Sequence, residues 1–323
     1  MKVEGIDHVN ILVKDLEAAM DFFCDVFGSK FIGPIDHRPQ LPIRIAVDNV
    51  GFALQSPTSR DHPFAKQIDE RGEGVGSIAV KVSDIDEGVA GLKAKGLKPV
   101  RMPPEEREIV ELPSLKSALF SGENAFGVQF ELVQYDAPHP AGIGNLGMLA
   151  KLPWVKKTTE PIMKVERIDH IHILVKDMEA AMSFFSSAFG SQFIFVDHGT
   201  HGVPLRVAFD NLLQFELQCA TNDFADYIQH LEERGEGVDR IGFNVSNIEE
   251  VVAGLVRKGL KAVFPDPLPR LGRQIRGGDG MKASIFAGEN AFGVQLEVVE
   301  FDTLLPVAIA HLGMIPGLPW FKD

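Results

Sequence analysis

The chain has 323 residues, of which 45% are hydrophobic and 24% are charged, so it is long enough for two domains that each bury a core. Acidic residues outnumber basic ones by 45 to 32, and the resulting net charge of -13 repels the phosphates of nucleic acids and anionic membranes. The sequence contains no apolar run of membrane-spanning length and no signal-peptide pattern at its start. We therefore expect a soluble, cytoplasmic protein that acts on a small molecule and binds neither nucleic acid nor membrane.

The first half of the sequence predicts strands and helices in alternation. Short apolar runs predict strands over residues 9–13, 44–47, 51–55, 78–82, 118–121 and 128–133. Asp15 and Asp84 fit the N-cap preference and precede two amphipathic stretches, so each is predicted to begin a helix. Gly28 and Gly96 are predicted to end these two helices.

The second half of the sequence repeats the first. The segment IDHVNILVKDLEAAMDFFCDVFGSKFI from Ile6 and the segment IDHIHILVKDMEAAMSFFSSAFGSQFI from Ile168 are identical at 19 of 27 positions. Further matching pairs are ERGEGV from Glu70 and Glu233, and GENAFGVQ from Gly122 and Gly288. The repeat predicts two homologous domains, residues 1–156 and 163–323.

Several of these segments carry a family resemblance: IDHV with ILVKDLEAAMDFF, ERGEGV before a predicted strand, VSDIDEGVAGLKAKGLKPV and GVQFELVQ. With them the chain resembles the vicinal oxygen chelate superfamily, also called the glyoxalase/bleomycin-resistance/dioxygenase superfamily. The resemblance covers nearly the whole chain, once per half, and each half is most similar to methylmalonyl-CoA epimerase. It implies an α+β fold of tandem glyoxalase-like domains, in which four βαβββ modules form two curved mixed-sheet cups.

The resemblance also implies a divalent metal in such a cup, which for this chain could be Fe, Mn, Co, Ni or Zn. In the second half the family's ligand positions match His170, Glu216 and Glu297, which offer an imidazole and two carboxylates. The fourth position falls on Arg240, which stays protonated and cannot be a ligand. We therefore expect the working site in the second half.

The first half matches the implied ligand set less well. His8 and Glu131 fall on the first and last ligand positions, but Ala53 and Ser77 occupy the other two. Two ligands alone rarely hold a transition metal tightly. We expect this half to be degenerate, with a structural role or a role in supporting the substrate.

Other interpretations of the second-half residues stay open. An ion pair of Arg240 with Glu297 or Glu216 would fill the site without a metal. His172, two residues after His170, faces the same side of a strand and is a spare ligand, a general base or a packed histidine. The strand histidines His8 and His170 are also compatible with ordinary buried hydrogen bonding.

The loops and tails supply weaker candidates. The arginines of PRLGRQIRGGDG are expected either to hold an anionic group of the substrate or to be solvated: Arg270, Arg273 and Arg276. Loop residues expected either to face the substrate or to be solvated are Asp197, His198, His201, Asp36 and His37. The tails at 146–154 and 312–320 contain both tryptophans, and we expect each to dock on a sheet or on a second subunit of a homodimer.

Three functions remain open from the sequence. The first is isomerase- or lyase-type proton chemistry on a small oxygenated or acyl anion, with His172 or His198 exchanging the proton. The second is an Fe(II)-type dioxygenase of a keto acid or catechol. A dioxygenase needs two histidines and one carboxylate, so His172 or a loop histidine would have to replace the histidine lost at Arg240. The third is a metal-free enzyme or binding protein that uses Arg240 as an anion clamp.

Overall fold

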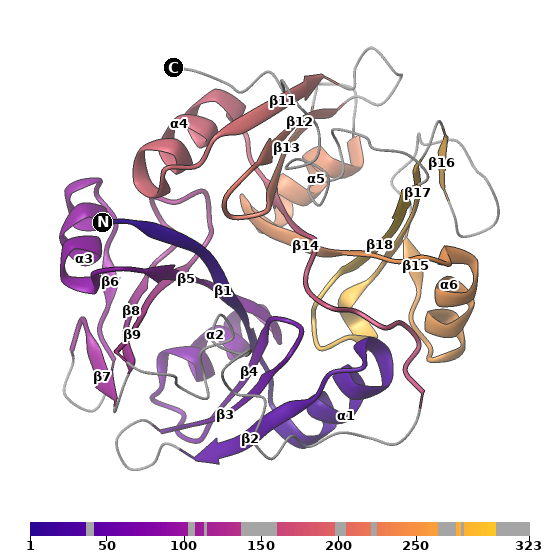
Figure 1. Cartoon of the computed structure of the whole chain (residues 1–323), viewed down its shortest axis with the longest axis horizontal. Coiled ribbons are helices and arrows are strands. Elements are labelled where there is room, and N and C mark those ends of the chain that lie inside the picture. The colour runs from indigo at the N-terminus through magenta and orange to yellow at the C-terminus, as the bar shows by residue number, and fades with distance from the viewer. Residues whose placement is uncertain are drawn as a thin grey trace. The chain divides into compact units, whose positions relative to one another are not determined.

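The computed structural model describes residues 1–36, 42–102, 107–112, 115–136, 160–197, 205–220, 225–263, 276–278 and 281–301. The chain divides into two compact units (Figure 1). The first unit comprises Met1–Asn124, Gln129–Arg167 and Gly288–Val294. The second unit comprises Ala125–Val128, Ile168–Ala287 and Gln295–Asp323.

The first unit is built around one mixed sheet. Its strands are β1 (Val3–Leu12), β2 (Phe31–Asp36), β3 (Ile43–Asp48), β4 (Phe52–Pro57), β5 (Gly74–Val82), β6 (Pro99–Val100), β7 (Val110–Leu112), β8 (Leu115–Phe120) and β9 (Phe130–Tyr135). Its helices are α1 (Leu16–Phe27), α2 (Pro63–Arg71) and α3 (Ile85–Ala94). The strands pair in the order β2-β3-β4-β1-β5-β9-β8-β6, and β7 pairs with β8.

The second unit repeats this arrangement. Its strands are β10 (His170–Leu174), β11 (Phe193–Asp197), β12 (Leu205–Asp210), β13 (Phe215–Ala220), β14 (Gly237–Asn244), β15 (Ala262–Val263), β16 (Arg276–Gly278), β17 (Met281–Phe286) and β18 (Leu296–Phe301). Its helices are α4 (Met178–Phe189), α5 (Ala225–Arg234) and α6 (Ile248–Arg257). The strand order is β11-β12-β13-β10-β14-β18-β17-β15, with β16 paired to β17. The two mixed sheets confirm the predicted α+β fold of paired βαβββ modules.

The predicted helix boundaries follow from local chemistry. The side chain of Asp15 accepts a hydrogen bond from the backbone N–H of Ala18 and caps α1; that of Asp84 accepts one from Glu87 and caps α3. Gly28 ends α1 in the left-handed conformation, with φ of 72°, which glycine adopts without steric cost. The apolar pattern does not predict α2, since Phe64 and Ile68 are its only buried residues among those described.

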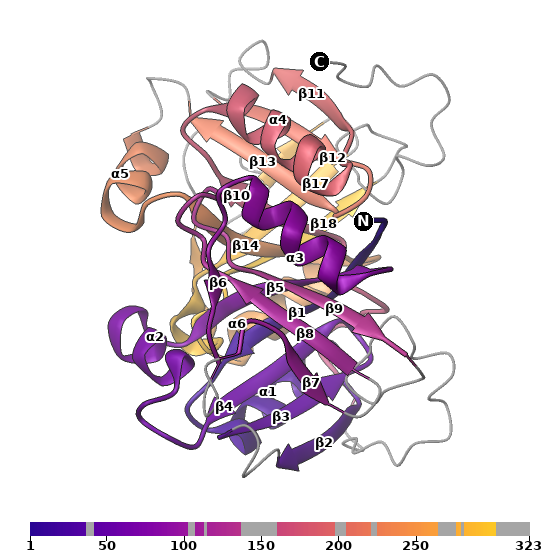
Figure 2. The same cartoon turned by 90° about the vertical axis from the view of Figure 1, so that its left-hand side faces the viewer.

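In each sheet one face packs against two helices, and the side chains of the candidate site lie on the other face. Phe23 of α1 contacts Phe52 of β4 with ring centroids 4.9 Å apart, and Phe52 pairs in register with Val9 of β1. In Figure 2, α3 likewise crosses the strands β8 and β9, which it contacts. Because strand side chains alternate between faces, His8 and Asn10 point to the opposite, concave face.

The concave faces of the two units are filled differently. In the first unit an apolar cluster joins β1, β3 and α2 to β8 across the cup: Leu12, Ile43, Phe64, Ile68 and Leu119. In the second unit the corresponding cluster joins β10, β11, β12 and α5: Leu174, Ile194, Leu205, Val207, Phe209, Tyr227 and Leu231. Among the described residues, this second cluster has no member from β17 or β18.

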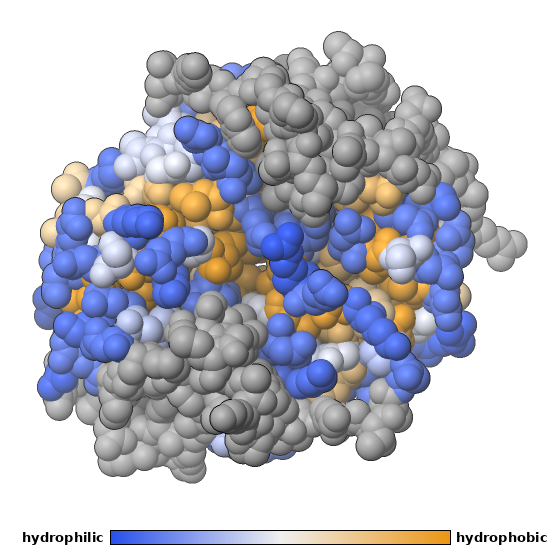
Figure 3. Space-filling model, in the orientation of Figure 1, coloured by the Kyte–Doolittle hydropathy of each residue, from blue (hydrophilic) through white to orange (hydrophobic). Residues whose placement is uncertain are grey.

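On the face shown in Figure 3, the described surface has hydrophilic residues interspersed with hydrophobic ones. Val256 and Val263, each 36% exposed, are the exposed large hydrophobic residues of the described part. Within the same residues, none of the helices has the length and apolarity that a membrane crossing requires.

A buried histidine begins α2 in the first unit. His62 is fully buried, and its Nδ1 accepts a hydrogen bond of 3.2 Å from the backbone N–H of Phe64. Its Nε2 has no hydrogen-bond partner. Burial lowers the pKa of His62 to about 4, because the apolar surroundings disfavour the charged imidazolium.

This histidine should make the protein acid-sensitive. Its pKa is lower in the folded chain than the value of about 6.5 expected when unfolded, so protonation favours unfolding as the pH falls from 6.5 towards 4. Between pH 7.5 and pH 5 the free energy of unfolding should fall by about 2 kcal/mol more in the wild type than in His62→Asn. Asparagine keeps a capping acceptor and does not titrate. Urea unfolding of both proteins at the two pH values measures the difference, and equal losses would contradict this role.

Candidate metal centre

The candidate site is centred on β10, an interior strand of the second sheet. Strand β10 runs parallel to β13 and antiparallel to β14, and β14 runs parallel to β18. In one row across the sheet, His170 pairs with Gly242 and Gly242 pairs with Glu297. In the next row, His172 pairs with both Glu216 and Arg240. The register therefore brings the side chains of four strands to one place on the concave face.

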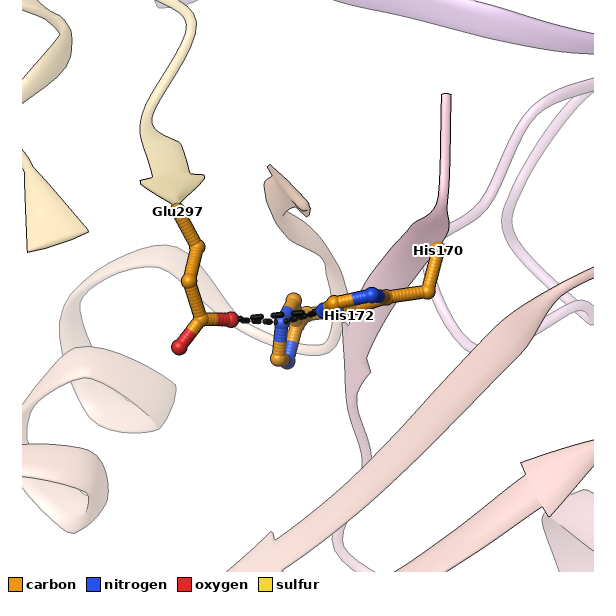
Figure 4. Close-up of side chains that lie close together, drawn as sticks. All are labelled: His170, His172 and Glu297. Carbon is orange, nitrogen blue, oxygen red and sulfur yellow. Dashed lines mark hydrogen bonds and ion pairs between the residues drawn. The ribbon is translucent and has the colours of Figure 1, made fainter. Parts of the chain in front are cut away.

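Three potential ligand atoms converge in this place, as Figure 4 shows. The Nε2 atoms of His170 and His172 are 2.7 Å apart. The Oε2 atom of Glu297 lies 3.4 Å from the Nε2 of His170 and is in contact with the Nε2 of His172. All three residues are buried, and their ligand atoms lie within 4.8 Å of one another.

Hydrogen bonds alone do not account for the short distances between these three atoms. If His172 carries a proton on Nε2 for Glu297, it cannot use the same nitrogen to accept a hydrogen bond from His170. The Nδ1 of His172 is buried and has no hydrogen-bond partner. Ligand atoms about 3 Å apart match neighbouring positions around an ion with bonds of about 2.1 Å. The donor set of two imidazoles and one carboxylate thus fits a divalent transition metal.

A carboxylate orients the first histidine. The Nδ1 of His170 lies 2.7 Å from the Oδ2 of Asp169, so Nε2 is the nitrogen that faces the other ligand atoms. Burial by itself would lower the pKa of His170, but Asp169, Glu297 and Glu216 outweigh it and raise the pKa to about 10. Burial would likewise raise the pKa of Glu297, yet His172, His170 and Arg240 hold it well below its usual range.

Glu216 lies beside the three converging atoms. Its Oε1 is 3.4 Å from the Nδ1 of His172 and accepts a hydrogen bond of 2.6 Å from Gln218. Its Oε2 is 3.7 Å from the Nε2 of His170. Glu216 therefore places a carboxylate near the Nδ1 of His172, at a longer distance than the 2.7 Å that separates Asp169 from the Nδ1 of His170.

Arg240 is buried at the edge of the site, with 5% of its surface exposed. Its Nη1 is 3.0 Å from the Oδ2 of Asp239, and its Nη2 donates to Gln218 at 2.9 Å and to the hydroxyl of Tyr227. The Nε is 3.8 Å from the Oε2 of Glu297 and has no hydrogen-bond partner. The guanidinium is thus held mainly by Asp239, Gln218 and Tyr227, and the carboxylate of Glu297 stays directed at the two histidines.

The equivalent place in the first unit is a closed hydrogen-bond network. Asn10 replaces the second histidine and donates to Ser77 at 2.8 Å and to the Oε2 of Glu131 at 2.7 Å. The Oε1 of Glu131 accepts from Ser117 at 2.5 Å. His8 makes the same 2.7 Å contact with a preceding aspartate, Asp7, which also accepts a hydrogen bond from Tyr135. Both oxygens of Glu131 are therefore already occupied by protein donors.

The structure brings together the suggested site residues whose side chains it describes, in one group for each unit. His170, His172, Glu216, Glu297 and Arg240 share one site, and His8 and Glu131 lie 3.8 Å apart in the first unit. His37, His198, His201, Arg270, Arg273 and the two tryptophan-containing tails lie outside the described residues. Asp36, Asp197 and Arg276 lie in β2, β11 and β16, but their side chains are outside the described part.

Sequence reasoning missed the residues that support the site. Asp169 precedes His170 as Asp7 precedes His8, so the repeated pair Asp-His was a usable signal. The repeat gives no comparable signal for Tyr227 and Asp239, because different residues, Phe64 and Gly76, occupy their positions in the first half.

Both halves of the chain match family models. Residues 5–109 match the model named Glyoxalase and residues 169–276 match the model named Glyoxalase_4. Both models are described as belonging to the Glyoxalase/Bleomycin resistance protein/Dioxygenase superfamily.

Solved structures give the same fold. A mutant of 4-hydroxymandelate synthase from Streptomyces coelicolor aligns over 97% of this chain and 96% of its own, with a TM-score of 0.61 and 15% identity. A fusion of a xylose isomerase-like TIM barrel with 4-hydroxyphenylpyruvate dioxygenase aligns over 93% of this chain and 49% of its own, with a TM-score of 0.57 and 14% identity. A methylmalonyl-CoA epimerase from S. coelicolor covers 42% of this chain and 100% of its own, at 24% identity and a TM-score of 0.38. The first two similarities establish the fold and nothing finer.

The raised pKa of His170 predicts how cation binding depends on pH. A metal can bind to the Nε2 of His170 only after the proton leaves, so affinity should rise about tenfold per pH unit between pH 6 and pH 8. Asp169→Asn should flatten this dependence, while Asp7→Asn in the first unit should leave it unchanged. Titration of the metal-free protein with Mn(II) at several pH values measures it. An affinity that stays constant over this range would show that no proton competes for the site.

Proposed function

The chain belongs to the Glyoxalase/Bleomycin resistance protein/Dioxygenase superfamily, and from this premise we propose that it is a metal-dependent enzyme. Its site is the group formed by His170, His172 and Glu297. We propose further that the bound metal is ferrous iron and that the reaction is the oxygenation of a small anionic substrate by dioxygen. The observation that carries the proposal is the convergence of two imidazole nitrogens and one carboxylate oxygen at distances near 3 Å.

The donor set favours this chemistry over the alternatives. Two histidines and one carboxylate on one face of an ion, with the other positions open, are typical of non-haem Fe(II) oxygenases. Arg240 removes the histidine that the family resemblance implies at that position, and His172 supplies an imidazole from β10 instead. A ferrous ion held here would supply the one-electron chemistry through which dioxygen reacts with an organic molecule.

The protein's own groups have separate tasks in this proposal. Asp169 holds the imidazole of His170 in the tautomer that presents Nε2. Glu216 lies 3.4 Å from the Nδ1 of His172 without a hydrogen bond, and it places a negative charge beside the second imidazole. Arg240, fixed by Asp239, places a permanent positive charge beside Glu297, where it lowers the electron donation of that carboxylate and attracts an anionic substrate group.

A second function is favoured by one specific distance. The Oε2 of Glu216 lies 3.7 Å from the Nε2 of His170, close enough for Glu216 to act as a fourth ligand or as a base. In that case the metal would polarise a substrate carbonyl and the carboxylate would move a proton, as in an isomerase or lyase. The two functions differ in whether dioxygen is consumed.

Changing the carboxylate in each unit should show which of the two units binds the metal. Glu297→Gln removes the anionic ligand, and metal affinity should fall by more than about 100-fold, because loss of an outer-shell partner alone costs 10- to 100-fold. Activity should be lost with it. Glu131→Gln is the matched change in the first unit and should leave both properties near the wild-type level. Metal analysis after dialysis against Fe(II) without oxygen gives the first readout.

An active, verified metal-free preparation would contradict the assignment of the metal. A loss of metal in Glu131→Gln equal to that in Glu297→Gln would contradict its location in the second unit.

A variant of Glu216 can distinguish between the two proposed reactions, oxygenation and proton transfer. If Glu216 only supports His172 through its charge, then Glu216→Gln should retain metal with about 10- to 100-fold lower affinity, and substrate-dependent oxygen uptake should continue once the site is saturated. If Glu216 is the base, exchange of substrate protons with deuterated water should occur in the wild type without oxygen and vanish in the variant. An oxygen electrode and NMR follow the two reactions with a panel of 2-oxo acids and catechols.

A further inference from the structure

A glycine faces the first histidine of the site. Gly242 on β14 pairs across the strands with His170, and the imidazole of His170 lies over its Cα. A Cβ atom added at Gly242 would stand 2.2 Å from both the Cε1 and the Nε2 of this ring. Carbon atoms in non-bonded contact normally stay about 3.5–4.0 Å apart. The imidazole of His170 therefore occupies the volume that a side chain at residue 242 would need.

The ring has little freedom to move aside. Asp169 holds its Nδ1 at 2.7 Å, and His172 lies against its other side with ring centroids 4.5 Å apart. His170 as a whole is 2% exposed. A methyl group at residue 242 would therefore turn the imidazole away from the Nε2 of His172 and the carboxylate of Glu297.

The first unit shows the same position with the methyl group in place. Ala79 pairs with both His8 and Glu131, as Gly242 pairs with His170 and Glu297. His8 keeps the 2.7 Å contact with its aspartate, but its Nε2 lies 3.8 Å from Glu131, compared with 3.4 Å from His170 to Glu297. Asn10 fills the place of the second imidazole with amide hydrogen bonds.

We propose that Gly242 is a positioning residue of the metal site, and that Ala79 together with Asn10 excludes the metal from the first unit. This inference rests on the proposed function, since it takes His170, His172 and Glu297 as the ligands. The first unit keeps a histidine and a carboxylate, His8 and Glu131, so a glycine at residue 79 and a second imidazole at residue 10 would complete the same set of ligands.

The loss experiment changes the glycine alone. Gly242→Ala should weaken Fe(II) binding by about 10- to 100-fold, as the loss of an outer-shell partner does, although every ligand is still present. Equilibrium dialysis against Fe(II) without oxygen measures the affinity, and far-UV circular dichroism verifies that the metal-free variant has the wild-type fold. Ala79→Gly is the matched control and should leave binding as in the wild type, at about one ion per chain.

The gain experiment does not depend on a destabilised variant. Asn10→His with Ala79→Gly gives the first unit two imidazoles, a carboxylate and the glycine, and should raise the bound Fe(II) from about one to about two ions per chain. Asn10→His alone should leave it at about one, because Ala79 still displaces the ring of His8. Repeating the pair in the Glu297→Gln background isolates the new site.

The outcomes separate this inference from the proposed function. No metal in the wild type would contradict the proposed function itself. Wild-type affinity in Gly242→Ala, or equal gain of metal by Asn10→His with and without Ala79→Gly, would overturn the role of the glycine while the metal centre stands. No gain in the double variant would overturn the role assigned to Ala79.

Discussion

The site depends on one physical constraint, which is that three Lewis-basic atoms are forced together in a buried place. The Nε2 atoms of His170 and His172 and the Oε2 of Glu297 face one another within hydrogen-bond range. A buried carboxylate is costly unless it is paired, and the available protons cannot satisfy all three atoms at once. In the proposed function a divalent cation resolves this conflict, and the carboxylate of Asp169 orients the imidazole of His170 through its hydrogen bond.

The internal repeat places a candidate metal site and a closed hydrogen-bond network at equivalent positions of two similar units. Both units share strand order, register and the aspartate that precedes the first histidine. In the first unit Asn10 donates to Ser77 and to the carboxylate of Glu131, and Ser117 donates to the other oxygen of that carboxylate, so both of its oxygens are occupied by protein donors. Apolar packing between α2 and β8 closes the cup of the same unit. The proposed function therefore assigns the metal site to one copy, whose side chains differ from those of the other copy on a common scaffold.

The sequence predicted the fold well and the site in part. The repeat, the N-caps at Asp15 and Asp84 and the family resemblance together predict two sheets of the observed kind, because these signals are local. The sequence also singled out His170 and Glu297, and it placed His172 on the same face of its strand. Whether His172 or Glu216 faces the centre depends on a register shift after His172 and on side-chain direction, which the sequence pattern does not encode. The partners of Arg240 and the space above Gly242 arise from contacts between separate strands and α5.

A metal-bound crystal structure tests the central claim most directly. Crystals soaked in Mn(II), examined by anomalous diffraction at the manganese edge, should show one strong peak in the second unit. The account predicts that this peak lies within bonding distance of the Nε2 atoms of His170 and His172 and of the carboxylate of Glu297. A peak bonded to Glu216 in place of His172, or a strong peak between His8 and Glu131, would contradict it.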